Sequence, residues 1–198
     1  FKEKVIPEQF VESDWSSASY FFSIAALSES VKLTLSKFSK DSLQGDLKLI
    51  DIYKKFGVVT IFEDENIILK KNNKSLPKNI HLNLIDNPDI AQTILITCLG
   101  LGIDCTLIGL HTLKIKETDR LVALKNEIEK FEVDKIEITG DSITLENNSD
   151  LKHDVTIDTY NDHRMAMSFA PLSLLVPINI KNPEVVTKSY FNFWNDLE

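Results

Sequence analysis

Two short segments contain the residue types that bind small anions and move protons. The first, KIKETDR, carries Lys116, Glu117 and Arg120. On a helix, Lys116 and Arg120 would project from one face, with Glu117 on the opening turn. Free N–H groups and the dipole at a helix start favour an anion. The segment therefore predicts a phosphate or carboxylate site, and its structural alternative is a solvated helix start with local ion pairs.

The second segment, YNDHRMAM, places His163 and Arg164 at the beginning of an apolar stretch. The arginine fork suits a carboxylate or a phosphate. His163 is the weaker candidate, because a histidine beside an arginine is often only a surface pair. A third predicted helix start, VTKSYF, adds Lys188. Three cationic helix starts are thus expected to surround a small polyanion.

An aspartate precedes each of three apolar helical segments, at Asp14, Asp89 and Asp162. Aspartate at this position caps free N–H groups. For Asp89, capping and contact with a ligand both remain open. The sequence shows no glycine-rich phosphate loop, CxxC pair, Ser/His/Asp triad or metal-ligand cluster. No metal and no organic cofactor are predicted.

Three weakly similar units divide the chain, at residues 14–71, 89–146 and 162–198. Each has an apolar helix, a short β-rich run and a second helix near SLQGD, KETDR or TKSYF. The first two units end in a predicted hairpin. The third stops before one, which would leave an open sheet edge. We expect an α/β (α+β) globule of βαβαββ-type units around a pseudo-threefold axis, with the third unit incomplete.

Composition limits the class of protein. The 198 residues are 43% hydrophobic and carry a net charge of −8, which argues against nucleic acid or an anionic membrane as partner. No apolar run approaches the ~20 residues of a membrane span. Cys98 and Cys105 are expected to be buried, reduced thiols, as in a cytoplasmic protein. Without an initiating methionine or a signal sequence, the chain is interpreted as a processed or excised piece. The periodic residues Leu121, Leu124, Ile128 and Phe131 are expected in the core.

Six segments follow one another as in the C-terminal globule of the EPSP synthase family (3-phosphoshikimate 1-carboxyvinyltransferases), which the chain therefore resembles. They are VESDWSSASYF, SLQGD, NPDIAQT, LKIKETDRL, TYNDHRMAM and NPEVVTKSYFNFW. The resemblance implies one globule, spanning 1–198, of the two-domain enolpyruvyl transferase fold. It also implies that the absent N-terminal globule completes the fold and the site, so that the isolated chain is inactive. The fold relative that acts on UDP-N-acetylglucosamine does not share the KETDR and YNDHR pair.

The family transfers the enolpyruvyl group of phosphoenolpyruvate to the 5-hydroxyl of shikimate 3-phosphate and releases phosphate, without a cofactor. This reaction belongs to chorismate and aromatic amino acid biosynthesis. The resemblance implies that Glu117 transfers protons, and that Asp89 contacts the shikimate hydroxyls as a second candidate base. It implies phosphoenolpyruvate contacts for Arg120, Arg164 and Lys188, a shikimate contact for Lys116, and a neighbouring role for His163. Thr112 stands where relatives have an asparagine, so only that contact departs from the pattern.

Two other interpretations remain open. One is a related enolpyruvyl transferase with another alcohol acceptor. The other is a non-catalytic binding domain that kept the fold. The presence of Glu117 and Asp89 beside the cations favours an enzyme, because binding an anion requires no carboxylates.

Overall fold

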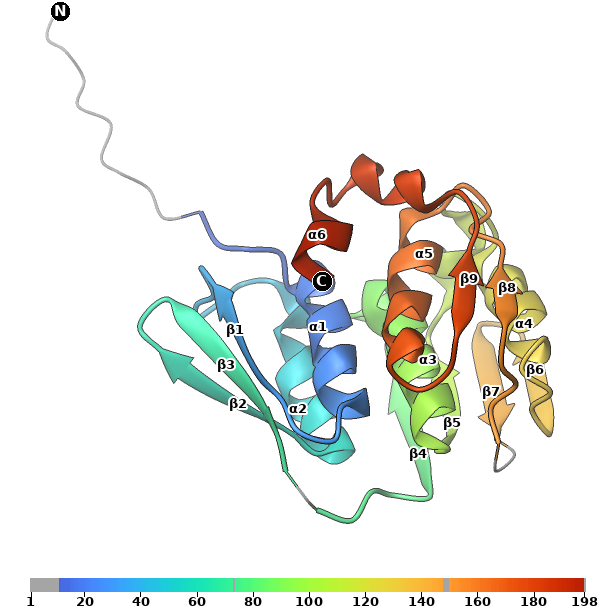
Figure 1. Cartoon of the computed structure of the whole chain (residues 1–198), viewed down its shortest axis with the longest axis horizontal. Helices are drawn as coiled ribbons and strands as arrows, with labels where there is room; N and C mark the ends of the chain where they lie inside the picture. The colour runs from blue at the N-terminus through green and yellow to red at the C-terminus, as the bar shows by residue number, and fades with distance from the viewer. Residues whose placement is uncertain (1–10, 73, 148–149, 198) are drawn as a thin grey trace, which may run out of the picture.

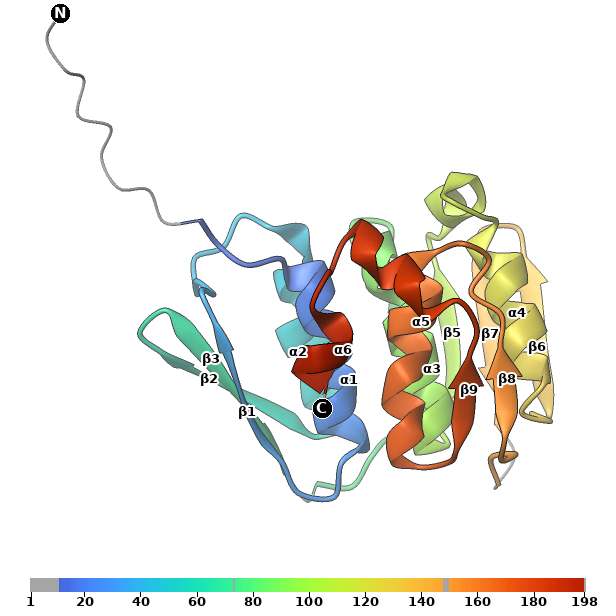
Figure 2. The same cartoon turned by 45° about the horizontal axis from the view of Figure 1, so that its top comes forward.

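The computed structural model describes residues 11–72, 74–147 and 150–197. Three helices lie side by side in the centre, with small sheets around them, as both views show (Figures 1 and 2). These central helices are α1 (Trp15–Leu27), α3 (Ala91–Leu101) and α5 (His163–Phe169). Their N-terminal ends point the same way, which places the segments that precede them at one end of the molecule.

The second unit shows the complete repeat. Its sheet has the order β4-β5-β7-β6, in which β4 is parallel to β5 and the other pairs are antiparallel. Besides α3, its elements are β4 (Asn79–Asn83), β5 (Asp104–Ile108), α4 (Arg120–Glu129), β6 (Lys135–Thr139) and β7 (Ser142–Glu146). Two 3-10 helices, η3 (Pro88–Ile90) and η4 (His111–Ile115), lead from the strands toward α3 and α4.

The first unit repeats the later part of this pattern. Its antiparallel sheet β1-β3-β2 corresponds to β5-β7-β6. The strands are β1 (Lys32–Ser36), β2 (Val58–Glu63) and β3 (Asn66–Lys71). Between β1 and β2 lies α2 (Leu49–Tyr53), flanked by η1 (Gly45–Lys48) and η2 (Lys54–Phe56).

The third unit repeats the earlier part. Strand β8 (Val155–Ile157) pairs in parallel with β9 (Ile178–Ile180), as β4 does with β5. Helix α5 and η5 (Ala170–Leu174) connect the two strands. Within the described residues no hairpin follows, and no strand pairs with the other edge of β9. The predicted fold class, with an incomplete third unit, is therefore confirmed.

Two details of the predicted organisation differ. Strands β4 and β8 precede the helices, so the structural repeat begins one strand earlier than the boundaries 89 and 162 suggest. The predicted helix start at TKSYF is wrong. Pro183 instead begins a 3-10 helix, η6 (Pro183–Lys188), and Ser189 leaves helical geometry with φ −140°. Helix α6 (Phe193–Leu197) begins only after this break.

Aspartate caps set three helix starts. The side chains of Asp14, Asp119 and Asp162 accept hydrogen bonds from backbone N–H groups of α1, α4 and α5. Helix α3 has no side-chain cap and is preceded by η3. It ends at Gly102, whose φ of 65° suits a residue without a side chain. The capping role predicted for Asp14 and Asp162 is confirmed.

A line of hydroxyl groups joins α1 to α3 inside the apolar core. The Ser19 and Thr93 hydroxyls lie 3.0 Å apart. The Thr97 hydroxyl lies 2.8 Å from that of Ser23 and 2.9 Å from that of Tyr53 on α2. All five residues are buried, and mutual hydrogen bonds compensate for their loss of water.

The predicted core positions of α4 and of the turn that follows it are also confirmed. Leu121, Leu124, Ile128 and Phe131 are at most 1% exposed. Cys98 and Cys105 are buried and form no disulfide. Among the described residues, no helix combines the length and the apolar character that a membrane crossing requires.

Candidate active site

A tight turn after β5 brings the KIKETDR segment toward the end of β4. Gly109 adopts φ 79°, and a Cβ atom there would lie 2.7 Å from the backbone nitrogen of Ile85. Only glycine combines this conformation with so close an approach. The chain then passes through η4 to Lys116, whose Nζ lies 3.2 Å from Asp89, and to Glu117.

The KIKETDR segment is not the helix start that its spacing predicted. Helix α4 begins at Arg120, and its N-cap Asp119 has extended geometry. Lys116 and Glu117 lie in the bend between η4 and α4, so they share no helical face with Arg120. The three side chains nevertheless converge, because the bend turns the chain back toward the start of α4.

Asp89 is the meeting point of the cations. Its carboxylate lies 3.2 Å from Nζ of Lys116, 3.6 Å from Nη1 of Arg120 and 3.4 Å from Nη2 of Arg164. Arg164 also donates to the Asp89 carbonyl at 3.0 Å. Burial raises the pKa of the Asp89 carboxyl, but Arg164, Lys116 and Arg120 outweigh this and hold the pKa below its ordinary value. Asp89 thus stays ionised and pairs with cations instead of capping α3.

Arg120 joins the second unit to the third. Its side chain is 2% exposed. Nε lies 2.6 Å from Oδ2 of Asp162, and Nη2 lies 3.3 Å from Oδ1 of Asp162 and 2.7 Å from Oε2 of Glu117. Nη1 has no hydrogen-bond partner among the described residues. Arg120 therefore retains donor capacity toward the side of Asp89, where an anion would also find Lys116 and Arg164.

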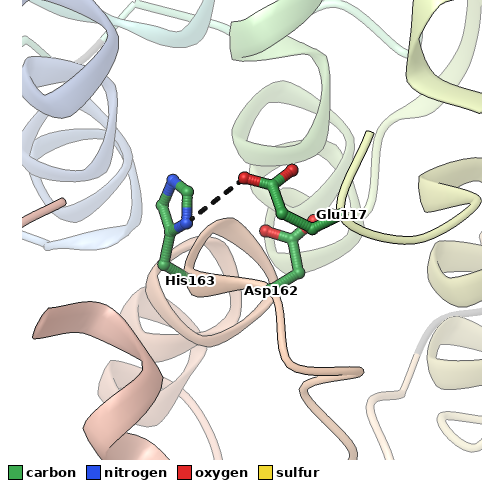
Figure 3. Close-up of side chains that lie close together, drawn as sticks. All are labelled: Glu117, Asp162 and His163. Atoms are coloured by element: carbon green, nitrogen blue, oxygen red, sulfur yellow. Dashed lines mark ion pairs between the residues drawn. The ribbon is translucent and has the colours of Figure 1, made fainter. Parts of the chain in front are cut away.

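His163 completes a close group with Glu117 and Asp162, whose side chains point toward one another (Figure 3). Nδ1 of His163 lies 3.6 Å from Oε1 of Glu117. Burial lowers the pKa of His163, although Asp162 and Glu117 raise it in part, so the imidazole is neutral at pH 7. The contact is therefore not a salt bridge at that pH. Both oxygens of Asp162 already bind Arg120, so the three groups favour an ion-pair network over a metal site.

Lys188 ends η6 and is bound by a turn of the third unit. Its Nζ donates to the carbonyl oxygen of Asn161 at 2.7 Å and to the side-chain oxygen of Asn161 at 2.8 Å. Within the described part of the chain no carboxylate pairs with Lys188. The turn is unusual, since Tyr160 and Asn161 both have positive φ, at 52° and 57°. Lys188 thus keeps an uncompensated positive charge.

Thr112 does not face the open surface. Its hydroxyl oxygen is buried and has no hydrogen-bond partner among the described residues. The contact that the resemblance implies at this position therefore stays a prediction.

Four cations therefore gather around three carboxylates in one cluster, although the whole chain is acidic. Sequence reasoning missed two partners in it. Asp162 binds Arg120 in addition to capping α5, and Asn161 binds Lys188. The position of Asp162 before a helix predicted a cap and gave no sign of its contact with Arg120. For the contact between Asn161 and Lys188, the sequence offered only the fact that asparagine tolerates positive φ.

Comparison with known proteins decides the family. The model of the family "EPSP synthase (3-phosphoshikimate 1-carboxyvinyltransferase)" matches residues 2–197. The chain belongs to the EPSP synthase family. It is 42% identical over 190 residues to the 3-phosphoshikimate 1-carboxyvinyltransferase of Bacteroides fragilis YCH46, which covers 94% of this chain and 46% of that protein. The 3-phosphoshikimate 1-carboxyvinyltransferase of Methanospirillum hungatei is 35% identical to this chain over 188 residues. The match covers 94% of this chain and 43% of that protein. The chain thus spans about half the length of these EPSP synthase relatives.

Solved structures share the fold. EPSP synthase from Acinetobacter baumannii aligns with a TM-score of 0.73 at 24% identity, over 92% of this chain and 44% of that one. The enolpyruvyl transferase NikO from Streptomyces tendae aligns with a TM-score of 0.68 at 12% identity, over 94% of this chain and 42% of its own. At these identities the likeness concerns the fold, and it confirms that EPSP synthase family members and this chain have the same architecture.

Proposed function

We propose that this chain is one half of the active site of an enzyme that transfers the enolpyruvyl group of phosphoenolpyruvate to the 5-hydroxyl of shikimate 3-phosphate. The observation that carries the proposal is the convergence of Lys116, Arg120 and Arg164 on Asp89, with Glu117 against Arg120. Family membership supplies the reaction class. The other half of the site belongs to the remaining length of the polypeptide, as the coverage of relatives suggests.

The proposed chemistry needs a proton donor, a base and cations. Glu117 protonates the methylene carbon of phosphoenolpyruvate, and the acceptor oxygen adds to the cationic carbon as Asp89 accepts its proton. Asp89 later passes this proton to the released phosphate or to solvent. A methyl proton then returns to Glu117 as the C–O bond to phosphate breaks. Arg120, Arg164 and Lys188 stabilise the departing phosphate.

The position of Glu117 adds one point to this scheme. Its Oε2 lies 2.7 Å from Nη2 of Arg120. The phosphate or carboxylate group of phosphoenolpyruvate would compete with Glu117 for Arg120, because arginine also binds these anions through paired N–H groups.

The decisive measurement is phosphate release by the complete polypeptide that contains this chain. Phosphoenolpyruvate and shikimate 3-phosphate are supplied separately and then together, and release only with both supports the proposal. Release with phosphoenolpyruvate and a different alcohol would favour the related transferase. Binding of either ligand by folded protein, without release, would favour a non-catalytic domain.

A further inference from the structure

A buried carboxylate lies outside the proposed catalytic cluster. Glu127, near the end of α4, is 0% exposed. Its Oε1 accepts from the Tyr160 hydroxyl at 2.8 Å, and its Oε2 accepts from the backbone N–H of Asp158 at 2.9 Å and from Lys130 at 2.5 Å. A buried carboxylate without partners is costly, whereas a fully hydrogen-bonded one makes the segments that it joins rigid.

The partners of Glu127 belong to the segment that leads into the site. Asp158 and Tyr160 lie three residues and one residue before Asn161. Asn161 binds Lys188, and the next residue, Asp162, binds Arg120. Helix α4 thus holds this segment at two points. Arg120 at its start binds one end through Asp162, and Glu127 binds the other through Asp158 and Tyr160.

The held segment contains the unusual turn. Tyr160 and Asn161 both occupy the left-handed region, at φ 52° and 57°, without being glycine. Each such residue costs of order 1–3 kcal/mol and persists only where its surroundings fix it. The Tyr160 hydroxyl bond to Glu127 is a contact that fixes it from outside the cluster.

We propose that Glu127 is a positioning residue for phosphoenolpyruvate binding, acting through Tyr160 on the turn of residues 160–164. The turn aims both oxygens of Asn161 at Lys188 and starts α5 so that Arg164 reaches Asp89. Loosening it would misplace two of the proposed phosphate-binding cations while leaving Glu117 and Lys116 in the other segment. This inference rests on the proposed function.

The test uses the complete polypeptide and the variant Tyr160→Phe, which removes the hydroxyl and keeps the ring. Loss of one hydrogen bond worth ~1 kcal/mol corresponds to about a fivefold effect. We expect hydrogen–deuterium exchange of amides 160–164 to accelerate about fivefold, and KM for phosphoenolpyruvate to rise by a similar factor. KM for shikimate 3-phosphate stays unchanged. The matched control is Glu129→Gln on the same helix, since Glu129 is exposed and its ion pair among the described residues is with Lys125, at 3.7 Å.

A merely structural role makes a different prediction. Tyr160→Phe would then lower the melting temperature and leave both KM values unchanged, which overturns the proposal. The proposal is also overturned if Tyr160→Phe leaves the hydrogen–deuterium exchange rates of amides 160–164 unchanged. Glu127→Gln keeps the shape of the side chain and one acceptor oxygen. This variant should therefore retain more of the affinity for phosphoenolpyruvate than Glu127→Ala does. A wild-type protein that transfers no enolpyruvyl group would contradict the proposed function, and exchange at 160–164 would then decide the positioning role by itself.

Discussion

Replacing Asp162 with asparagine tests the buried ion pair with Arg120 separately from the helix cap. Asparagine caps helices as well as aspartate, so the bond to the Arg164 N–H can be kept. Its NH2 group, however, cannot accept from Arg120 Nε, which Asp162 contacts at 2.6 Å. Breaking a buried pair costs about 3–5 kcal/mol when the remaining charge is left alone. Because Glu117 still contacts Arg120 at 2.7 Å, we expect the lower end, about 3 kcal/mol.

Urea unfolding of the complete polypeptide measures this loss. With a slope of about 2 kcal/mol/M, the midpoint of the transition that involves this half should fall by roughly 1.5 M. Asp14→Asn is the matched control, because Asp14 caps α1 and is exposed, and its midpoint should barely move. Equal small shifts for both variants, below about 0.5 M, would refute the view that Arg120 depends on Asp162.

Three further outcomes are expected. Glu117→Gln should abolish turnover in the complete enzyme and spare substrate binding, and near-normal turnover would remove Glu117 from the mechanism. Arg164→Ala should weaken phosphoenolpyruvate about 10–100-fold in calorimetry, as loss of hydrogen bonds to a charged group implies, and equal weakening of shikimate 3-phosphate would contradict the assignment. NMR titration of His163 should give a pKa below 6.5, because burial opposes its protonation. The neutral imidazole's contribution to the free energy of unfolding is therefore present above pH 6.5 and is lost as pH falls through the lower folded value.

The sequence predicted the repeat and the identity of the clustered charges because both depend on local patterns. Asp14 and Asp162 cap helices as their positions suggest, and the spaced leucines of α4 lie in the core. The sequence also predicted that the cations of different units would meet. Lys116, Arg120 and Arg164 do so at Asp89.

The pairing inside the cluster was not predictable from local spacing. The i, i+4 rule assumes a helix from Lys116 onward, but Asp119 delays the helix to Arg120. The contacts of Arg120 with Asp162 and of Lys188 with Asn161 join residues 42 and 27 positions apart. Such contacts follow from how the units pack, which no single segment encodes.

The hydroxyl line between α1 and α3 has a consequence for the first unit, which contributes no cation to the cluster. Apolar helix faces can slip past each other by a turn of 5.4 Å and still pack. Directional bonds such as Ser19 to Thr93 and Ser23 to Thr97 permit no such slip. The first unit therefore fixes the position of α3 along the helix axis. This in turn fixes where Asp89, just before α3, lies relative to Arg120 and Arg164.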